Sequence, residues 1–514
     1  MFRLWRQCRA MLIGILCVLV AGCTVSGVNN VKPTATPERY SLAGGGKCVQ
    51  LGNRSVGPFT NTQASSDTFL AHSEPMIAVN PHNPLNFVAG SKFFTNLGRY
   101  LFQIGTYTSF DGGCTWTDNG VFTGFSTTSR TSDISFAFGD HNDVYAALLF
   151  QDGMKSGIAV IPSLDGGRTF GTPNIVYQDI TGKIFSDKPW IAVDTTNGQH
   201  QGTISVVWSY DSDTNQELGY SRSTDGGKTF SPVALVEGSN AACTYPTAGH
   251  AATAITCDGV LGATPTVLPN GTLAVAFAYV DVSANSDGDM QHAVSSQIAS
   301  RVQMNNPYPS KLLVVTSPDE GITWNSPVLV ATIADIPSPF PGQKYRNFSL
   351  PAFTSDPKSG QLYLSWADYA AGNADILLST SSNGGKRWSV PVRVNDDAAT
   401  SLSQQFQPQL AIAPNGTLSV MYFDTRNDPT QHRIDVMLAQ SLDHGVTFLP
   451  HVQVTTSGFD PSIQPPIDAS GQQFIGDYQG LAATDQFVYP CWNDTRTGRQ
   501  EIFVAAVPSA LPTK

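Results

Sequence analysis

The octet SFDGGCTW at residues 109–116 decides the fold, because its spacing of Ser, Asp, Gly, Thr and an aromatic residue recurs along the chain. The further copies are SLDGGRTF (163–170), STDGGKTF (223–230), SPDEGITW (317–324), SSNGGKRW (381–388) and SLDHGVTF (441–448). Only the fifth copy departs at the acidic and hydroxyl positions, with Asn383 and Arg387. A carboxylate can satisfy turn amides and a glycine adopts positive φ, so each octet predicts a tight turn. A repeated turn indicates a repeated structural unit.

Apolar segments with the length of β-strands surround the octets. In one unit, SDKPWIAVD (186–194) and TISVVWSY (203–210) precede ELGYSRS (217–223), which runs into the octet. In another unit, SPVLVAT (326–332) leaves the octet. The unit is therefore predicted to be a four-stranded antiparallel sheet, with the octet between its third and fourth strands. No helical periodicity of similar strength follows residue 22.

Repeated four-stranded sheets in one chain predict an all-β fold, the β-propeller, in which ring closure protects the sheet edges. After the sixth octet, GDYQGLAAT (476–484), FVYPCWNDTR (487–496) and EIFVAAV (501–507) supply three strands of a seventh unit. We expect KCVQLG (47–52) to add the fourth strand and close the ring. Seven blades are favoured, and six blades with one flanking unit are the alternative.

The octet is the Asp-box, and the chain resembles the bacterial neuraminidase (exo-sialidase) repeat proteins over about residues 70–507. The resemblance implies an extracellular glycan as ligand. It also implies chemistry that needs arginines to clamp a substrate carboxylate, an Asp as acid/base, and a Tyr nucleophile activated by a Glu.

Strand alternation places all six octets on one face of the propeller. The opposite, upper face then receives the beginnings of the first strands and the ends of the second strands. The polar residues at these places are the candidate site. Candidate catalytic residues are Asp187, Asp133, Tyr478 and Glu74, and candidate substrate-binding residues are Arg346, Arg426, Arg496, Lys188 and Asp477.

Two features keep a second interpretation open. The Arg-Ile-Pro signature of the neuraminidases is absent, and Ser73-Glu74-Pro75 and Asp187-Lys188-Pro189 occupy the matching positions. Arg426 and Arg496 lie in equivalent Asp-Thr-Arg segments, which favours a structural ion pair at a blade turn. The sequence therefore predicts either a sialidase-type glycoside hydrolase or a non-catalytic propeller that binds carbohydrate or protein.

The first 22 residues predict export from a bacterial cytoplasm. Arg3, Arg6 and Arg9 precede the apolar run MLIGILCVLV, and Val20-Ala21-Gly22-Cys23 resembles a lipobox. We expect cleavage before Cys23, lipidation of Cys23, and anchoring at the cell surface or envelope; an ordinary secretory signal with a chance cysteine is the alternative. Residues 23–65 are predicted to be a flexible Thr/Pro/Gly tether, and residues 66–514 a single propeller domain.

Charge and cysteine content limit the partners. The net charge of −11 argues against nucleic acid, and removal of a signal with three arginines makes the chain more acidic. We expect a monomer that touches the membrane only through its anchor. Cys243 and Cys257 are the first choice for a disulfide in this compartment.

No cofactor is expected. The spacing of Asp211, Asp213, Asn215 and Glu217 is that of calcium-loop oxygens. The loop nevertheless lacks the Gly and the final Glu of that motif, so a solvated polar loop is the default interpretation and calcium the alternative.

Overall fold

The computed structural model describes residues 59–212, 216–236, 259–280, 309–468 and 470–510. These residues form antiparallel strands grouped in seven sheets, and no helix occurs within them. The described part of the chain holds no helix with the length and apolarity needed to cross a membrane. The seven-bladed prediction is confirmed, and the six-bladed alternative is wrong.

Six of the sheets each contain four strands that follow one another in the chain. Sheet 1 holds β2 (Leu70–Asn80), β3 (Asn83–Asn96), β4 (Leu101–Ser109) and β5 (Thr117–Val121). Sheet 2 holds β6 (Arg130–Phe138), β7 (Val144–Asp152), β8 (Lys155–Ser163) and β9 (Asn174–Asp179). Sheet 3 holds β10 (Phe185–Val193), β11 (Ile204–Asp211), β12 (Gln216–Ser223) and β13 (Ala234–Leu235).

The next three sheets repeat this order. Sheet 4 holds β14 (Val260–Val267), β15 (Leu273–Tyr279), β16 (Lys311–Ser317) and β17 (Val328–Thr332). Sheet 5 holds β18 (Ala352–Ser355), β19 (Leu362–Asp368), β20 (Asp375–Ser381) and β21 (Val392–Arg393). Sheet 6 holds β22 (Gln405–Ile412), β23 (Leu418–Asp424), β24 (Asp435–Ser441) and β25 (Val452–Gln453).

The seventh sheet combines the two ends of the described chain. It holds β26 (Gly480–Ala483), β27 (Phe487–Asp494), β28 (Glu501–Ala505) and β29 (Val507–Pro508), with β1 (Asn61–Gln63) paired to β28. An N-terminal strand therefore closes the ring, as predicted, but the strand is Asn61–Gln63. The predicted segment 47–52 lies outside the described residues.

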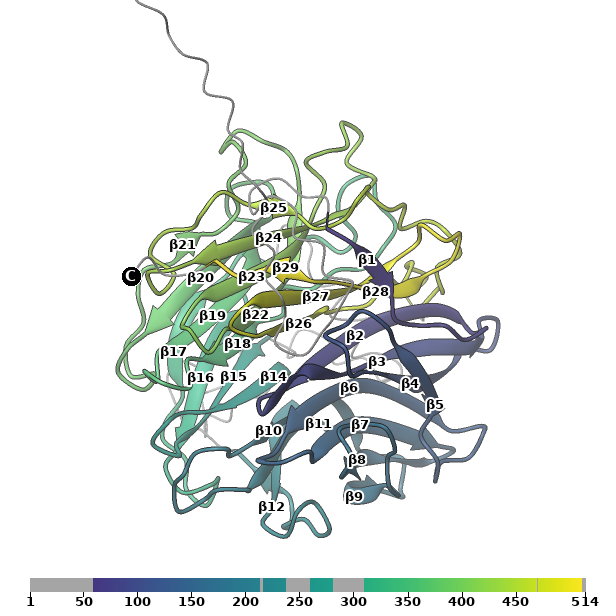
Figure 1. The fold of residues 1–514 in the computed structure, drawn as a ribbon, viewed down its shortest axis with the longest axis vertical. Coiled ribbons are helices and arrows are strands. Elements are labelled where there is room, and N and C mark those ends of the chain that lie inside the picture. The colour runs from purple at the N-terminus through teal and green to yellow at the C-terminus, as the bar shows by residue number, and fades with distance from the viewer. Residues whose placement is uncertain (1–58, 213–215, 237–258, 281–308, 469, 511–514) are drawn as a thin grey trace, which may run out of the picture. The chain divides into compact units, whose positions relative to one another are not determined.

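The first strand of each sheet lies at the centre of the ring. β2, β6, β10, β14, β18, β22 and β26 each contact the first strand of the next sheet, and β26 contacts β2. Their labels gather in the middle of Figure 1, with β5, β9, β12, β21 and β25 farther out. Because all the first strands start on one face, their initial residues meet there.

The repeated octets form the predicted turns. In the last copy, Ser441 Oγ donates to Asp443 Oδ1 at 2.8 Å, and the backbone and hydroxyl of Thr447 donate to the same carboxylate. The other octets that carry Asp and Thr repeat these contacts. In the fourth copy, Trp324 packs edge-on against Tyr220 of the preceding sheet, with ring centroids 5.1 Å apart. Each octet thus closes a blade, and this aromatic fills space between two blades.

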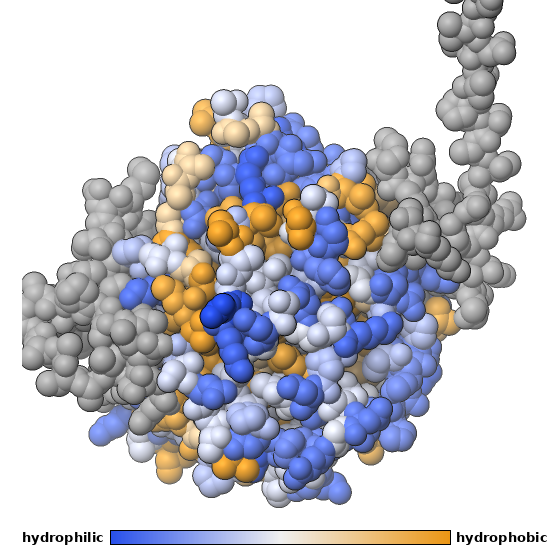
Figure 2. Space-filling model, turned by 90° about the vertical axis from the view of Figure 1, so that its left-hand side faces the viewer, coloured by the Kyte–Doolittle hydropathy of each residue, from blue (hydrophilic) through white to orange (hydrophobic). Residues whose placement is uncertain are grey.

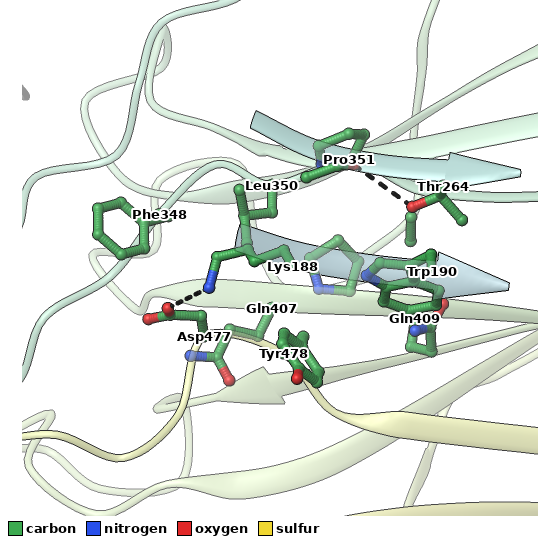
Figure 3. Close-up of a pocket in the computed structure, with 13 residues that line it drawn as sticks. Lys188, Trp190, Thr264, Phe348, Leu350, Pro351, Gln407, Gln409, Asp477 and Tyr478 are labelled. Atoms are coloured by element: carbon green, nitrogen blue, oxygen red, sulfur yellow. Dashed lines mark hydrogen bonds and ion pairs between the residues drawn. The ribbon is translucent and has the colours of Figure 1, made fainter. Parts of the chain in front are cut away.

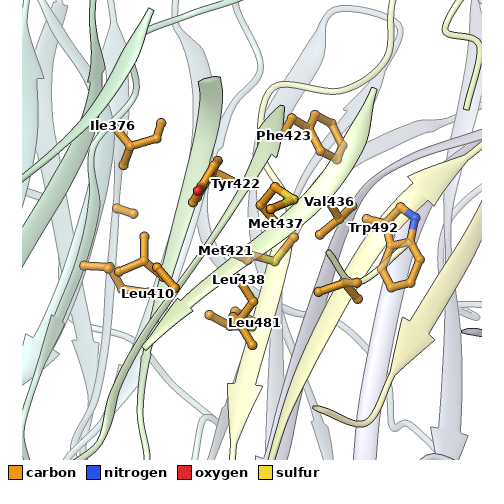
Figure 4. Packing of buried hydrophobic residues seen from close by; sticks show 14 of the residues in the cluster. Ile376, Leu410, Met421, Tyr422, Phe423, Val436, Met437, Leu438, Leu481 and Trp492 are labelled. Atoms are coloured by element: carbon orange, nitrogen blue, oxygen red, sulfur yellow. The ribbon is translucent and has the colours of Figure 1, made fainter. Parts of the chain in front are cut away.

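Apolar side chains fill the spaces between neighbouring sheets. In Figure 4, Leu410 of β22, Met421 of β23 and Leu481 of β26 belong to the same buried cluster as Trp492 of β27. Both faces of a middle strand are covered, and all seven residues of β23 are buried. This two-sided burial explains why the strands read as continuous apolar runs rather than as alternating patterns.

The outer surface carries separate apolar residues. Figure 2 shows hydrophobic patches that alternate with hydrophilic ones on the side facing the viewer. Val390 and Val446, which are 85% and 70% exposed, lie just after or within an octet. Single exposed apolar side chains of this kind are normal on the surface of a folded protein.

Candidate functional site

Five first strands share a local irregularity where they begin. Their pairing with the second strand shifts at Ser73/Met76, Ser132/Ser135, Asp187/Trp190, Leu261/Thr264 and Phe406/Gln409. Within each shift lies one residue with positive φ: Glu74 (54°), Asp133 (55°), Lys188 (49°), Gly262 (65°) and Gln407 (50°). Four of these five are not glycine. A bulge of this kind re-aims a side chain and often lies next to a functional site.

Each irregular residue stands two positions before the residue at which the regular pairing resumes. In sheets 5 and 7 the pairing begins at Ala352 and Gly480, so Leu350 and Tyr478 take the corresponding position. We call these seven residues the axial positions; they are Glu74, Asp133, Lys188, Gly262, Leu350, Gln407 and Tyr478.

Contacts between non-adjacent sheets show that axial side chains meet at the centre of the ring. Tyr478 Oη, from the seventh sheet, donates to Asp133 Oδ1 of the second sheet at 3.3 Å. Lys188 Nζ, from the third sheet, lies 2.8 Å from Asp477 Oδ2 and 3.5 Å from Asp133 Oδ1. The predicted upper-face residues of three sheets therefore form one cluster.

Asp477 is the anion around which two cations gather. Arg346 donates from Nε to Asp477 Oδ1 at 2.9 Å and from Nη2 to Oδ2 at 2.6 Å, which is a bidentate pair. Its Nη1 reaches Asp468 Oδ2 at 3.3 Å. The positive charges of Arg346 and Lys188 are thus paired with carboxylates of the protein itself.

A second ion pair lies beside the first. Lys92 Nζ is 2.6 Å from Glu74 Oε2, and both side chains are buried. Phe474 contacts a cation of each pair, with Lys92 Nζ 4.0 Å and the Arg346 guanidinium 4.5 Å from its ring centroid. The aromatic ring therefore stabilises both cations.

Burial and neighbouring charges shift the acids of this cluster in opposite directions. Burial raises the pKa of Glu74 to about 7, although Lys92 opposes the shift. Burial also raises the pKa of Asp187 to about 6. Burial acts in the same direction on Asp477, but Arg346 and Lys188 hold its pKa below its usual range. Asp477 is therefore a permanent anion, whereas Glu74 and Asp187 take up protons near neutral or mildly acidic pH.

Tyr478 is a hydrogen-bond donor at physiological pH. Burial, with the nearby charge of Asp133, raises the pKa of its phenol well above the usual value. The structure pairs Tyr478 with Asp133, whereas Glu74 pairs with Lys92. The nucleophile pair predicted from the sequence, Tyr478 with Glu74, is not a hydrogen-bonded pair.

A pocket opens beside this cluster (Figure 3). In Figure 3, one side of the pocket is formed by Lys188, Asp477 and Tyr478. The full lining is Lys188, Trp190, Gly262, Thr264, Phe348, Leu350, Pro351, Ala352, Gln407, Pro408, Gln409, Asp477 and Tyr478. The depression spans about 410 Å³ including space open to solvent. Its enclosed part has room for about one water molecule. The lining combines aromatic rings and uncharged polar groups with the ion pair of Lys188 and Asp477, as small-molecule sites do.

Two predicted site residues lie apart from this cluster. Arg426 Nε binds Asp424 Oδ2 at 2.7 Å, and its Nη1 binds Asp396. Arg496 Nη2 binds Asp494 Oδ2 at 2.5 Å. These contacts match the ion pairs at blade turns that the repeated Asp-Thr-Arg segments favour, and neither arginine shares a partner with Arg346.

Sequence reasoning missed several residues of the site. Lys92 and Phe474 come from the end of a second strand and from a loop, and no motif marks either of them. Gln407 precedes a proline, as Glu74 and Lys188 do, so the X-Pro pattern at the start of first strands could have found it. Gly262 lacks that proline, and only the aligned strand pairing reveals its position.

Other predictions fall partly beyond the described residues. Cys243, Cys257 and the calcium-loop residues 213–215 lie outside them. Cys114 is disulfide-bonded, and Cys491 is a free, buried thiol. Within the described ranges, no group of three or more His, Cys, Asp or Glu side chains is arranged to hold a metal ion.

Comparison with known proteins gives only distant likenesses. No family model matches the chain, and no curated protein sequence matches it. Among solved structures, a protein of unknown function from Dyadobacter fermentans is similar at 12% identity and TM-score 0.48, over 88% of this chain and 98% of that one. The Hadza microbial sialidase Hz136 is similar at 13% identity and TM-score 0.41, over 82% and 76%. The phage phi92 endosialidase is similar at 11% and 0.47, over 89% and 70%.

These identities and TM-scores carry no argument about activity. The assignment of a seven-bladed propeller stands on the strand pairing of the chain itself.

Proposed function

We propose that the protein is an exported glycan-binding propeller whose central depression, which is open to solvent, receives a sugar residue. The observation that carries the proposal is the pocket lining, in which Trp190, Tyr478 and Phe348 adjoin Thr264, Gln407 and Gln409. Aromatic rings cover the C–H faces of a sugar, and the weakly engaged hydroxyl of Thr264 can exchange hydrogen bonds with its hydroxyls. The amides of Gln407 and Gln409 already form hydrogen bonds within the protein and shape the wall of the depression.

The state of the arginines favours binding over sialidase chemistry. A sialidase needs guanidinium groups that are free to clamp the carboxylate of its substrate. Here Arg346 forms a bidentate pair with Asp477, and Arg426 and Arg496 bind aspartates at blade turns. A clamp would have to break ion pairs whose carboxylates are buried, which costs about 3 to 5 kcal/mol for each pair.

Sialidase-type hydrolysis is the second candidate, and one contact favours it. The hydroxyl of Tyr478 donates to the carboxylate of Asp133 close to Arg346 and Lys188. A tyrosine next to a carboxylate is the arrangement that this chemistry uses for its nucleophile. The raised pKa of Tyr478 argues in the other direction, because the phenol holds its proton firmly.

The same protein is proposed to be lipid-anchored at Cys23. The order of arginines, apolar run and Val20-Ala21-Gly22-Cys23 supports this part of the proposal. An anchor at the cell surface or envelope suits a receptor for extracellular glycans.

The experiment is a glycan array with the purified protein, followed by turnover of a fluorogenic sialoside. We expect saturable glycan binding and no turnover. Binding to no glycan on the array would overturn the proposal. If turnover occurs and is lost in Tyr478→Phe, hydrolysis replaces binding as the function.

A further inference from the structure

Cys114 forms a disulfide with a cysteine outside the described residues. It is the sixth residue of the first octet, in the turn between β4 and β5, and it is disulfide-bonded. The other cysteine within the described ranges, Cys491 of β27, is free and buried. The candidates for the partner are therefore the cysteines of the rest of the chain, namely Cys8, Cys17, Cys23, Cys48, Cys243 and Cys257.

Processing of the N-terminus removes three of these candidates. Cys8 and Cys17 lie within the first 22 residues, which the predicted export signal loses on cleavage. Cys23 is the residue that we propose to carry the lipid, which occupies its sulfur. This step rests on the proposed export and anchoring of the protein. The candidates that remain are Cys48, Cys243 and Cys257.

The chain between β13 and β14, which holds Cys243 and Cys257, leaves and re-enters its sheet on the face opposite the octets. β13 ends beside the start of β12, and the N–H of Gly259 donates to the carbonyl of Gln216, the first residue of β12, at 2.7 Å. The octet of this sheet begins at Ser223, at the other end of β12. The eight residues of β12 span roughly 25 Å. Cys257 stands two residues before Gly259 and cannot cover that length, so we expect it to bond with Cys243.

Cys48 precedes β1, and the chain enters β1 from the octet face. Asn61, the first residue of β1, pairs with Ala505, the last residue of β28. β28 is the third strand of its sheet, and the third strands of the other six sheets all end at the first serine of an octet. Cys48 lies 11 residues before Phe59, and a chain of that length reaches at most roughly 40 Å. Cys48 is therefore within reach of Cys114 on that face.

The first octet lies against the sheet that β1 completes. Its Trp116 packs against the same apolar cluster as Tyr489 of β27. A Cβ built on Gly113, the residue before Cys114, would lie 3.6 Å from Cε1 of Tyr489. Cys114 and the entry to β1 thus lie at the same junction, where sheet 7 meets sheet 1 and the ring closes.

We propose that Cys48 and Cys114 form a disulfide that holds the ring closed at this junction. The two thiols lose their hydrogens as the S–S bond forms. Two electrons and two protons pass to a protein oxidant of the export compartment that carries a disulfide, and this oxidant becomes a dithiol. The bond connects the chain that leads into β1 with the first octet of sheet 1.

The disulfide acts on the shortest part of the closure. β1 has three residues, all of them partly buried, and its loss would leave the edge of β28 unpaired. Such a short edge strand opens readily by local unfolding. A bond at Cys48 limits how far β1 can move from β28. It also transmits a pull on the proposed membrane tether to sheet 1 instead of to β1.

Peptide mapping without reduction identifies the bond. The full-length protein is extracted from membranes with its free thiols alkylated, and it is digested with trypsin. Trypsin separates the cysteines into peptides 48–54, 100–130 and 229–301, which hold Cys48, Cys114, and Cys243 with Cys257. We expect peptide 48–54 linked to peptide 100–130, and the two should separate on reduction. A link from peptide 100–130 to any other peptide would overturn the inference.

Serine variants test whether the bond holds β1 in place. We expect Cys48→Ser and Cys114→Ser each to lower the melting temperature by about 3 °C or more. The double variant should lower it no further, because both substitutions break the same bond. The β28 amides should exchange hydrogen faster in all three variants. Lys228→Ser is the matched control, because Lys228 is exposed and occupies the same octet position in sheet 3.

The remaining outcomes separate this inference from the proposed function. If Cys114 is alkylated while Cys243 and Cys257 are bonded, the export stands and this inference is overturned. If all three are alkylated, the proposed export fails together with the inference. Additive losses in the double variant, or β28 exchange no faster than in Lys228→Ser, would also overturn it. If the serine variants do not fold, the map of the wild-type protein decides.

A mapped bond in a protein that binds no glycan would leave this inference standing and remove only the proposed glycan binding.

Discussion

At the scale of single residues, the buried carboxylates at the centre of the propeller differ in pKa because different numbers of cations surround them. Asp477 stays charged because Arg346 and Lys188 surround it, whereas Asp187 receives only the backbone N–H of Lys188 at 3.0 Å. Both carboxylates belong to adjoining parts of the same cluster. Their opposite pKa shifts arise from the number of cations that reach each one.

Asp187→Asn should change how stability depends on pH. The folded-state pKa of Asp187 is raised to about 6, so the folded protein binds this proton more tightly than the unfolded chain does. This stabilisation is complete below pH of about 4 and is lost as the pH rises to about 6. Melting temperatures measured from pH 4 to 7 should fall more steeply for the wild-type protein than for Asp187→Asn. Parallel curves would contradict the prediction. Glu74 contributes to the pH dependence of both proteins, so its contribution cancels in the comparison.

Arg496→Ala should weaken folding and leave glycan affinity unchanged. Asp494 is fully buried, and Arg496 also donates from Nη1 to Asn61 Oδ1 and to Thr456 Oγ1, each at 2.8 Å. Loss of the guanidinium leaves a buried carboxylate without its cation and should lower the free energy of unfolding by about 3 to 5 kcal/mol. Denaturant titration measures this change, with the exposed Arg433→Ala as control. A loss of glycan affinity without a loss of stability would indicate instead that Arg496 takes part in glycan binding.

At the scale of elements, the closing strand β1 shows what the sequence could and could not predict. The missing fourth strand of the last unit could be inferred from the repeat count, because every other unit has four. The segment that supplies this fourth strand could not be inferred, because a strand of three residues carries almost no periodic signal. Asn61, Thr62 and Gln63 pair with Ala505, Val504 and Phe503, and the sheet rather than local propensity determines their conformation.

Ser65→Ala should loosen this closure. The hydroxyl of Ser65 donates to Glu501 Oε2 at 2.5 Å and accepts from the N–H of Ile502 at 2.9 Å, and both side chains are buried. Its removal leaves a buried donor and a buried carboxylate with one partner fewer, which should cost about 1 to 3 kcal/mol. The control is Thr62→Ala on β1, where the side chain is only partly buried. Hydrogen exchange of the β28 amides should rise in Ser65→Ala and not in the control; equal exchange in both would count against this role.

At the scale of the whole molecule, the fold could be predicted more fully than the site. Six octets and three further strands determine the number of blades, because each blade repeats the same turn chemistry. Strand direction also predicts the face on which Glu74, Asp133, Lys188 and Tyr478 meet. The pairing of these side chains could not be predicted, because Tyr478 reaches Asp133 across sheets far apart in the chain.

Cys23→Ser should separate anchoring from folding. If Cys23 is acylated, the substituted protein loses its lipid and should leave the membrane fraction. Its melting temperature should not change, because the described sheets begin with β1 at Asn61. Fractionation of cells that express each protein measures the first effect, and calorimetry measures the second. Retention of the serine variant in membranes would exclude lipidation at this residue as the anchor.

The seventh sheet also constrains when the molecule can be completed during biosynthesis. Ser65 and Glu501 are 436 residues apart, yet they hydrogen-bond across one sheet edge. At ribosomal speeds of roughly 5 to 20 residues per second, β28 emerges roughly 20 to 90 s after β1. During that interval the nascent chain carries an unpaired first strand and an incomplete ring. A chain released before residue 501 therefore lacks the partner of β1, and such truncated products should be substrates for chaperones and proteases of the compartment in which the protein folds.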